Sequence, residues 1–294
     1  MDIDGDGYRD ILSGSYSRTD PDMAGLFQVL YGRAYGTFRR AEVLKGTDGE
    51  PLTIATQGSE GRDQLTEKIC TRPFAVDWDG DGNLDLVVGN FAGTFYWFKG
   101  RGKGTFSPRG EWIKAGASPL RITGYHSDPF VIDWDGDGDL DLLSGSSNGG
   151  VQWAENRAGK GKAPELSSFQ ALIKQGPPVV LSGPLFLREA DLTGPTQETR
   201  VWVDDVNCDG KLDILLGDSV TLVSPAKGVS EEQFKKQFTN WQNAITATVS
   251  KLHSAGSDEK ARRKAGEEFH QLFDQRAEFM QEERTGFVWL YLQK

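Results

Sequence analysis

Carboxylates recur at alternate positions around a glycine turn in four segments of the chain. These segments are DIDGDGYRD at 2–10, DWDGDGNLD at 77–85, DWDGDGDLD at 133–141 and DVNCDGKLD at 205–213. In each nine-residue loop, the side chains at loop positions 1, 3, 5 and 9 and the carbonyl at position 7 can converge on one hard cation. Packing four carboxylates so closely is unfavourable unless a cation neutralises them. Ligation by oxygen alone at this density favours calcium.

Glycine stands at loop position 6 in all four segments, where the chain must reverse around the ion: Gly7, Gly82, Gly138 and Gly210. An EF-hand loop also opens with DxDxDG, but it needs a flanking helix and a bidentate Glu at position 12. The four loops lead instead into ILSG, LVVG, LLSG and ILLG. Short apolar runs closed by glycine are typical of buried strands, so each loop is expected to connect two strands.

The spacing of the loops leaves room for a four-stranded meander around each of them. The second unit shows this most clearly, with strands expected at 73–76, 84–90, 94–99 and 105–113. The third strand has an aromatic signature, FYW at 95–97, VQW at 151–153 and FVW at 287–289, and a weaker FQV at 27–29. These tryptophans could stack against a ligand, but their regular recurrence favours packing between sheets.

The last unit is interrupted before its third strand by a segment of helical composition. Residues 229–284 are rich in Glu, Lys, Gln and Ala, and Ser230 with Gln233 forms a capping box. Two apolar stripes flank a break at 254–257: Phe234, Phe238, Trp241, Ile245 and Leu252, then Ala265, Phe269, Leu272 and Phe273. We expect an antiparallel helical hairpin whose stripes pack on each other or on the sheets; alternatively, the aromatic face docks a partner or a second copy.

Through these four loops and the strands that follow them, the chain resembles the FG-GAP/VCBS repeat family, which includes the integrin α-subunit propellers. The resemblance implies an all-β fold, a partial β-propeller of about four blades of four-stranded meanders, with calcium between the first two strands of each blade. The blades would occupy 1–228 and 285–294, and the α-helical hairpin at 229–284 would be an insertion outside the family pattern.

The resemblance implies up to four calcium ions, held by four sets of ligands. The sets are Asp2, Asp4, Asp6, Asp10 and the Tyr8 carbonyl; Asp77, Asp79, Asp81, Asp85 and the Asn83 carbonyl; Asp133, Asp135, Asp137, Asp141 and the Asp139 carbonyl; and Asp205, Asn207, Asp209, Asp213 and the Lys211 carbonyl. In the fourth loop Asn207 removes one negative charge and Cys208 replaces a glycine. Because ligand charge sets calcium affinity, the fourth loop is predicted to be the weakest site.

The composition limits which binding partners and which cellular location the chain can have. The net charge of −10 argues against a nucleic-acid partner, and no apolar run is long enough to span a membrane. Extracellular calcium modules are filled at about 10⁻⁴–10⁻³ M calcium, so we expect a periplasmic, cell-surface or secreted location. The chain has no signal peptide, and its first loop begins at Asp2, so it is expected to start within a longer protein. Whether Cys70 pairs with Cys208 is left open.

Three functions remain open at this point. The first is a non-enzymatic propeller, rigidified by calcium, that binds a protein or a glycan, as in adhesion modules. The second is the propeller domain of a polysaccharide lyase or hydrolase, in which His126 could act as a general base, although a lone histidine more often bonds a loop carbonyl. The third is an assembly scaffold, in which the helical hairpin or open sheet edges join a partner or a second copy.

Overall fold

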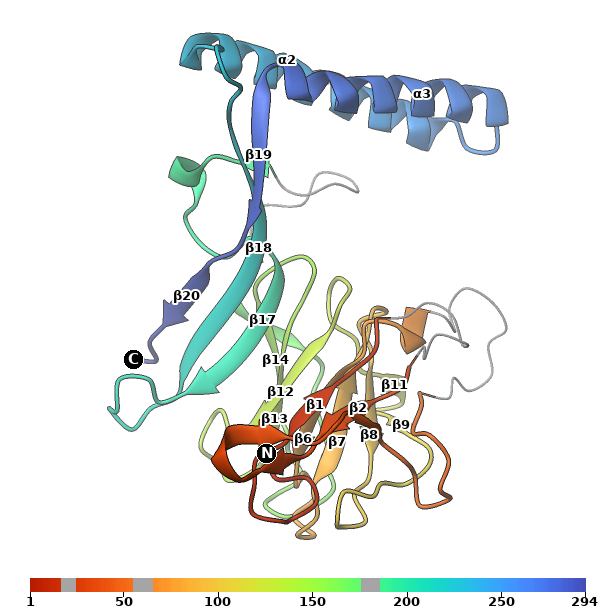
Figure 1. Ribbon diagram of the computed structural model, residues 1–294, viewed down its shortest axis with the longest axis vertical. Helices are drawn as coiled ribbons and strands as arrows, with labels where there is room; N and C mark the ends of the chain where they lie inside the picture. The colour runs from red at the N-terminus through yellow and green to blue at the C-terminus, as the bar shows by residue number, and fades with distance from the viewer. Residues whose placement is uncertain (17–24, 55–65, 176–185) are drawn as a thin grey trace. The chain divides into compact units, whose positions relative to one another are not determined.

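The computed structural model describes residues 1–16, 25–54, 66–175 and 186–294, and these residues form mainly strands in several antiparallel sheets (Figure 1). The chain divides into two compact units. The first consists of 1–176, 195–218 and 288–294, and the second of 177–194 and 219–287. The division falls within the long strand β18 (Asp213–Pro225), whereas the composition of the sequence placed it at residue 229.

Two four-stranded meanders in the first unit have their strands in chain order and antiparallel throughout. One contains β6 (Arg72–Val76), β7 (Asp85–Gly89), β8 (Phe95–Phe98) and β9 (Glu111–Trp112), and the other β12 (Asp128–Ile132), β13 (Asp141–Gly145), β14 (Val151–Ala154) and β15 (Gln170–Ile173). The acidic loops lie between the first two strands of each. Strand β9 is shorter than expected, because Phe106 makes bridges with Gly46 and Gly100 instead.

The other strands of the first unit form smaller groups. Before the meanders come a three-stranded sheet of β1 (Ile11–Ser13), β2 (Gln28–Leu30) and β5 (Glu42–Val43), and a hairpin of β3 (Gly32–Arg33) and β4 (Thr37–Phe38). A second hairpin joins β10 (Lys114–Ala115) to β11 (Ser118–Pro119). The first part of β18 lies between β17 (Gln197–Asp204) and β20 (Val288–Tyr291), with Leu216 opposite Trp289. The expected third strand of the fourth unit is thus β20.

Glycines at the ends of second strands let successive sheets of this unit approach closely. A Cβ added to Gly14, Gly89 or Gly145 would lie only 1.9, 2.3 or 2.3 Å from the carbonyl oxygens of Thr71, Ser127 and Thr199. Each of these oxygens belongs to the start of the next sheet, so no side chain fits between them. The packing is propeller-like in chain order, and no ring closure is seen among the described residues.

The cores of the first unit lie between these sheets. Trp78 at loop position 2 is 3% exposed, and its ring lies 5.9 Å from that of Trp97 on the third strand. Trp97, Trp153 and Trp289 all pack against apolar clusters. The recurring tryptophans therefore serve the packing between sheets, the alternative that their regular spacing favoured.

In the second unit, the helices α2 (Glu231–Ser254) and α3 (Glu259–Gln275) form the expected antiparallel pair and lie side by side in Figure 1. The capping box is present, since Gln233 N donates to Ser230 Oγ at 3.3 Å and Ser230 N to Gln233 Oε1 at 3.0 Å. The apolar stripes face each other, with Trp241 Nε1 donating to the Leu272 carbonyl at 2.8 Å. Phe234 and Trp241 are buried in the core of this unit, and Phe238 and Phe273 pack against it while partly buried.

The residues that follow the helices depart from the expectation. A helical hairpin was expected as far as 284, but Met280–Thr285 form strand β19, which pairs with β18 from Val220 to Pro225. Short β16 (Phe186–Leu187) pairs with β18 in parallel. The reason is that Val223, Phe279 and Met280 are buried with the helical core, so pairing with β18 outweighs the helical composition. No helix in the described ranges is both long and apolar enough to cross a membrane.

Candidate metal centre

The four acidic loops share one pattern of backbone hydrogen bonds. The carboxylate at position 1 accepts the N–H of position 6 at 2.8 to 3.0 Å, in the pairs Asp2–Gly7, Asp77–Gly82, Asp133–Gly138 and Asp205–Gly210. The carboxylate at position 5 accepts the N–H of position 7 at 2.9 to 3.0 Å, in the pairs Asp6–Tyr8, Asp81–Asn83, Asp137–Asp139 and Asp209–Lys211. The alternating sequence therefore folds each loop into the same turn, and the glycine at position 6 supplies its positive φ.

The aspartate at position 9 has a different environment from the other acids. Asp10, Asp85, Asp141 and Asp213 are all buried, with exposed fractions of 7% or less. One oxygen of each carboxylate accepts the backbone N–H of loop position 2. The other oxygen accepts a backbone N–H just after the third strand, in the donor–acceptor pairs Gly32–Asp10, Gly100–Asp85, Asn156–Asp141 and Gln293–Asp213. This carboxylate therefore ties the loop to a third strand, a role that sequence spacing did not reveal.

Three of the loops bring carboxylate oxygens to within 4.8 Å of one another. These groups are Asp2, Asp4 and Asp10 in the first loop, Asp77, Asp79 and Asp81 in the second, and Asp133, Asp135 and Asp137 in the third. Such a set of oxygen donors suits a hard cation such as calcium. The position 7 carbonyls of Tyr8, Asn83, Asp139 and Lys211 remain predicted ligands.

The second loop shows carboxylate oxygens that lack a protein donor. Asp77 Oδ1 and Asp79 Oδ1 are both buried and accept no hydrogen bond. The Asp79 side chain is only 8% exposed, and its other oxygen forms an ion pair with Lys99 Nζ. Lys99 Nζ also lies 3.5 Å from Asp81 Oδ2. Buried carboxylate oxygens need a donor or a cation, so these two atoms fit a metal ligand set.

The first loop also has a basic neighbour. Arg39 Nη2 lies 3.3 Å from Asp4 Oδ2 and 3.5 Å from Asp6 Oδ2. The same guanidinium stacks over the Tyr31 ring, with its carbon 4.9 Å from the ring centroid. Burial, followed by the charges of Glu42, Asp4 and Asp10, raises the pKa of Tyr31. Arg39 thus neutralises part of the first loop from outside the motif.

The third loop carries additional negative charge instead of a cation. Burial raises the pKa of Asp135, and the neighbouring charges of Asp137, Asp133 and Glu155 raise it further. Burial also raises the pKa of Asp141 to about 6. In the second loop, by contrast, the backbone N–H of Asn83 and the Lys99 ammonium lower the pKa of Asp81. The two loops therefore share a backbone turn but differ in electrostatic balance.

The fourth loop keeps the turn but differs in composition. Asn207 Nδ2 donates to Asp209 Oδ2 at 3.1 Å, whereas in the first and second loops the same position 5 oxygen lies 3.5 Å from Arg39 Nη2 or Lys99 Nζ. Cys208 adopts φ of 60°, in the left-handed region that glycine occupies at this position elsewhere. Cys208 is exposed and Cys70 is buried, and the two do not form a disulfide with each other.

His126 lies away from the acidic loops and contacts a residue that the sequence did not single out. Its Nδ1 is 2.6 Å from Glu198 Oε2, and its Nε2 is buried without a hydrogen-bond partner. The Phe91 ring packs edge-on against the imidazole. A carboxylate, and not the expected loop carbonyl, therefore holds this ring.

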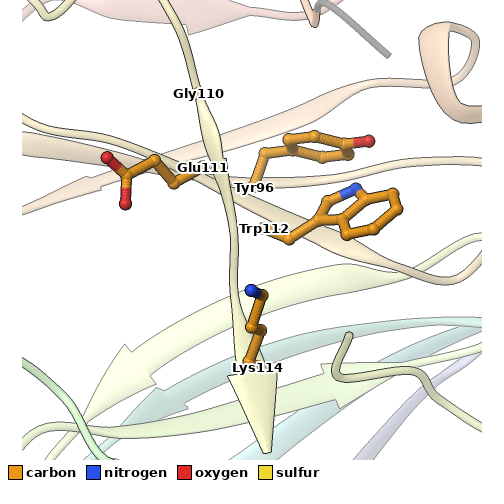
Figure 2. A pocket seen from close by; sticks show the side chains of 5 residues that line it. All are labelled: Tyr96, Gly110, Glu111, Trp112 and Lys114. Atoms are coloured by element: carbon orange, nitrogen blue, oxygen red, sulfur yellow. The ribbon is translucent and has the colours of Figure 1, made fainter. Parts of the chain in front are cut away.

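A small pocket lies at the outer edge of the first meander. It has a volume of about 370 Å³ and is lined by Tyr96, Gly110, Glu111, Trp112 and Lys114. Figure 2 shows the rings of Tyr96 and Trp112 on the same side of the strand, with the Glu111 carboxylate directed to the other side. The Tyr96 hydroxyl bonds to Glu67, which fixes the ring. Tyr96 is only 2% exposed, so the partly exposed Trp112 ring is the aromatic surface that a ligand with an apolar face could contact.

Comparison with known proteins supports the repeat assignment. Residues 77–144 match the FG-GAP-like repeat family model. This segment runs from the second acidic loop through the third, so it is an FG-GAP-like repeat, as the motif predicted. Neither the curated proteins nor the solved structures give a match.

Proposed function

We propose that the chain is a calcium-binding, extracytoplasmic β-propeller module of about four blades, in which the metal is structural and the module binds a protein or a glycan. The observation that carries the calcium assignment is the pair of buried oxygens, Asp77 Oδ1 and Asp79 Oδ1, inside a cluster of three carboxylates. When bound, calcium would neutralise such clusters and hold the first two strands of each blade together. Asp77, Asp79, Asp81 and Asp85 would hold the ion in the second loop.

The acidic loops favour a structural metal over a catalytic one. The second, third and fourth loops each connect two paired strands. In the second and third loops, the aspartate at position 9 already fastens the loop to the sheet through two backbone N–H groups. A cation in this place adds rigidity to the turn. The fourth loop, with Asn207 in place of an aspartate, would bind most weakly.

The pocket beside Trp112 supports the binding part of the proposal. Sugars present apolar faces and hydroxyls, which a partly exposed ring such as Trp112 and a charged side chain such as Lys114 can bind. A non-enzymatic role is consistent with His126, whose free nitrogen is buried and whose other nitrogen bonds to Glu198. Calcium sites of this kind operate at extracellular calcium levels, which is the basis for an extracytoplasmic location.

Thermal melting in millimolar calcium and in EDTA tests the structural metal. A ligand that binds only the folded state stabilises it by about 2.7 kcal/mol at one hundred times its dissociation constant, so the melting temperature should rise with calcium. Magnesium at the same concentration is the control, since it requires a smaller octahedral site and should stabilise less. An unchanged melting temperature in EDTA would refute the structural calcium.

Ligand binding is tested separately with a panel of neutral and acidic oligosaccharides, with and without calcium. Trp112→Ala should abolish any binding that uses the pocket, whereas Trp202→Ala, at an exposed tryptophan elsewhere in the same unit, should leave it unchanged. Equal binding by both variants would exclude the pocket.

A further inference from the structure

The residue at one structural position beside each acidic loop differs in charge. That position is defined by the position 9 aspartate, which accepts an N–H at the exit of the third strand: Gly100 N to Asp85 Oδ1 at 2.6 Å and Asn156 N to Asp141 Oδ1 at 2.7 Å. The residue before each donor therefore occupies the same structural position in all four loops. It is Tyr31, Lys99, Glu155 and Leu292 in the four loops.

In the second loop this position supplies a cation to the ligand cluster. The Lys99 ammonium pairs with Asp79 and lies 3.5 Å from Asp81 Oδ2, so it contacts carboxylates at positions 3 and 5. Burial of Asp79, at 8% exposure, makes the charge on this carboxylate costly without a partner. Its Oδ1, and that of Asp77, still lack any donor, so one ammonium does not complete the site.

In the third loop the same position is acidic. Glu155 accepts a hydrogen bond from Arg157 at 2.6 Å. The next residue, Asn156, donates its N–H to Asp141 of the loop at 2.7 Å, which places Glu155 beside the loop. No basic side chain within salt-bridge distance of Asp133, Asp135 or Asp137 is found among the residues described. The carboxylates at positions 1, 3, 5 and 9 are as numerous as in the second loop. The third loop also has Asp139 at position 7, where the second has Asn83, so the two loops differ in charge at position 7 and at the position beside the loop.

We propose that Lys99 is a built-in counter-cation that competes with calcium for the second loop, whereas the third loop, with Glu155 at the equivalent position, is the high-affinity site. This inference rests on the proposed calcium function. Arg39 acts in the same way on the first loop, although it reaches Asp4 and Asp6 from beyond strand β4. The loops therefore fill in sequence as calcium rises, with the third before the second.

Calorimetric titration of the full chain with calcium tests the inference, supported by terbium luminescence. Terbium is a calcium substitute, and Trp78 and Trp134 adjoin the first ligand of the second and third loops, so each can sensitise a bound ion. Lys99→Met should raise the affinity of a weak site by about five- to tenfold, since a unit charge about 4 Å away contributes this much at a hydrated surface. Lys99→Arg, which keeps the charge, should behave as the wild type does.

The reverse change is made at the third loop. Glu155→Gln should weaken the tightest site by about fivefold, and Glu155→Lys should weaken it further. Lys45→Met removes an exposed positive charge elsewhere in the same unit and should leave all affinities unchanged. Circular dichroism of each variant in EDTA verifies that it folds as the wild type does.

The outcomes separate the two proposals. A wild-type chain that binds no calcium refutes the proposed function. If the wild type binds calcium but Lys99→Met and Glu155→Gln titrate as the wild type does, the function stands and the counter-cation role is wrong. If Lys45→Met raises the calcium affinity as much as Lys99→Met does, the gain reflects the overall charge of the protein, and the counter-cation role of Lys99 is wrong.

Discussion

His126, in the loop before β12, contacts Glu198 on β17, with Nδ1 and Oε2 2.6 Å apart. Both residues have a left-handed backbone, with φ of 59° and 52°. Such strain costs on the order of 1–3 kcal/mol for each residue, so it persists only where contacts offset it. Although burial raises the pKa of Glu198, the His126 hydrogen bond and the charges of His126, Arg200 and Arg72 hold it below its usual value of 4.5.

The depressed pKa gives Glu198 a pH-dependent contribution to stability. A carboxylate whose pKa is lower in the folded state stabilises the protein above its unfolded pKa, and this contribution is lost as pH falls through the folded pKa. Glu198→Gln should therefore be less stable than the wild type near neutral pH, and the difference should shrink as the pH falls below about 4.5. Urea unfolding in EDTA over a range of pH measures it.

Glu50→Gln is the control for this pH series, since Glu50 is exposed. It should show the wild-type free energy of unfolding at each pH. If the free energy of unfolding of Glu198→Gln equals that of the wild type at every pH, the contact between His126 and Glu198 does not contribute to stability.

The clamp made by the position 9 aspartate is predicted to stabilise the fold without metal. Asp85→Asn places an amide N–H₂ against the backbone N–H of Trp78 or Gly100 in a fully buried site. We expect a loss of about 1–3 kcal/mol in the free energy of unfolding, measured by urea denaturation in EDTA. Asp81→Asn, at exposed position 5, should leave stability in EDTA unchanged and weaken only calcium binding. If both variants lose the same free energy of unfolding in EDTA, the position 9 aspartate does not stabilise the fold in the absence of metal.

Close packing between sheets gives a second stability prediction. An alanine methyl at Gly145 would lie 2.3 Å from the Thr199 carbonyl oxygen, whereas at Gly217 the nearest atom is 3.9 Å away. Gly145→Ala should therefore cost about 1–3 kcal/mol or more by overpacking, and Gly217→Ala should change stability by less than about 0.5 kcal/mol. Thermal and urea unfolding of the two variants, in the same calcium concentration, compare them directly. If Gly145→Ala is as stable as Gly217→Ala, the sheets are not packed this closely.

Local sequence features were sufficient for the loops, the strands that flank them and the two helices. Alternating aspartates and a glycine at position 6 determine the turn through bonds within nine residues, and the capping box at Ser230 marks the start of α2. The recurring tryptophans predict which face of the third strand is buried, because residues two apart lie on the same face of a strand. These signals all act over short distances along the chain.

Partners distant in the sequence could not be predicted. Lys99 reaches Asp79 across the meander, and Glu198 reaches His126 from 72 residues away. Position 9 remains a predicted ligand, and the motif does not show that its carboxylates also accept the N–H groups of Gly100 and Asn156. Strand β19 was missed because its composition is helical, and its pairing with β18 depends on tertiary contacts.

Backbone strain at Cys208 yields the last prediction. Gly5, Gly80 and Gly136 occupy loop position 4 with φ of 76°, 70° and 77°, and Cys208 occupies it with φ of 60°. A residue with a Cβ pays about 1–2 kcal/mol in this conformation, so Cys208→Gly should raise the free energy of unfolding by about 1 kcal/mol in EDTA with a reducing agent present. Cys208→Ser retains the Cβ and should match the wild type. A serine variant as stable as the glycine variant would show that the thiol, and not the backbone, limits the fourth loop.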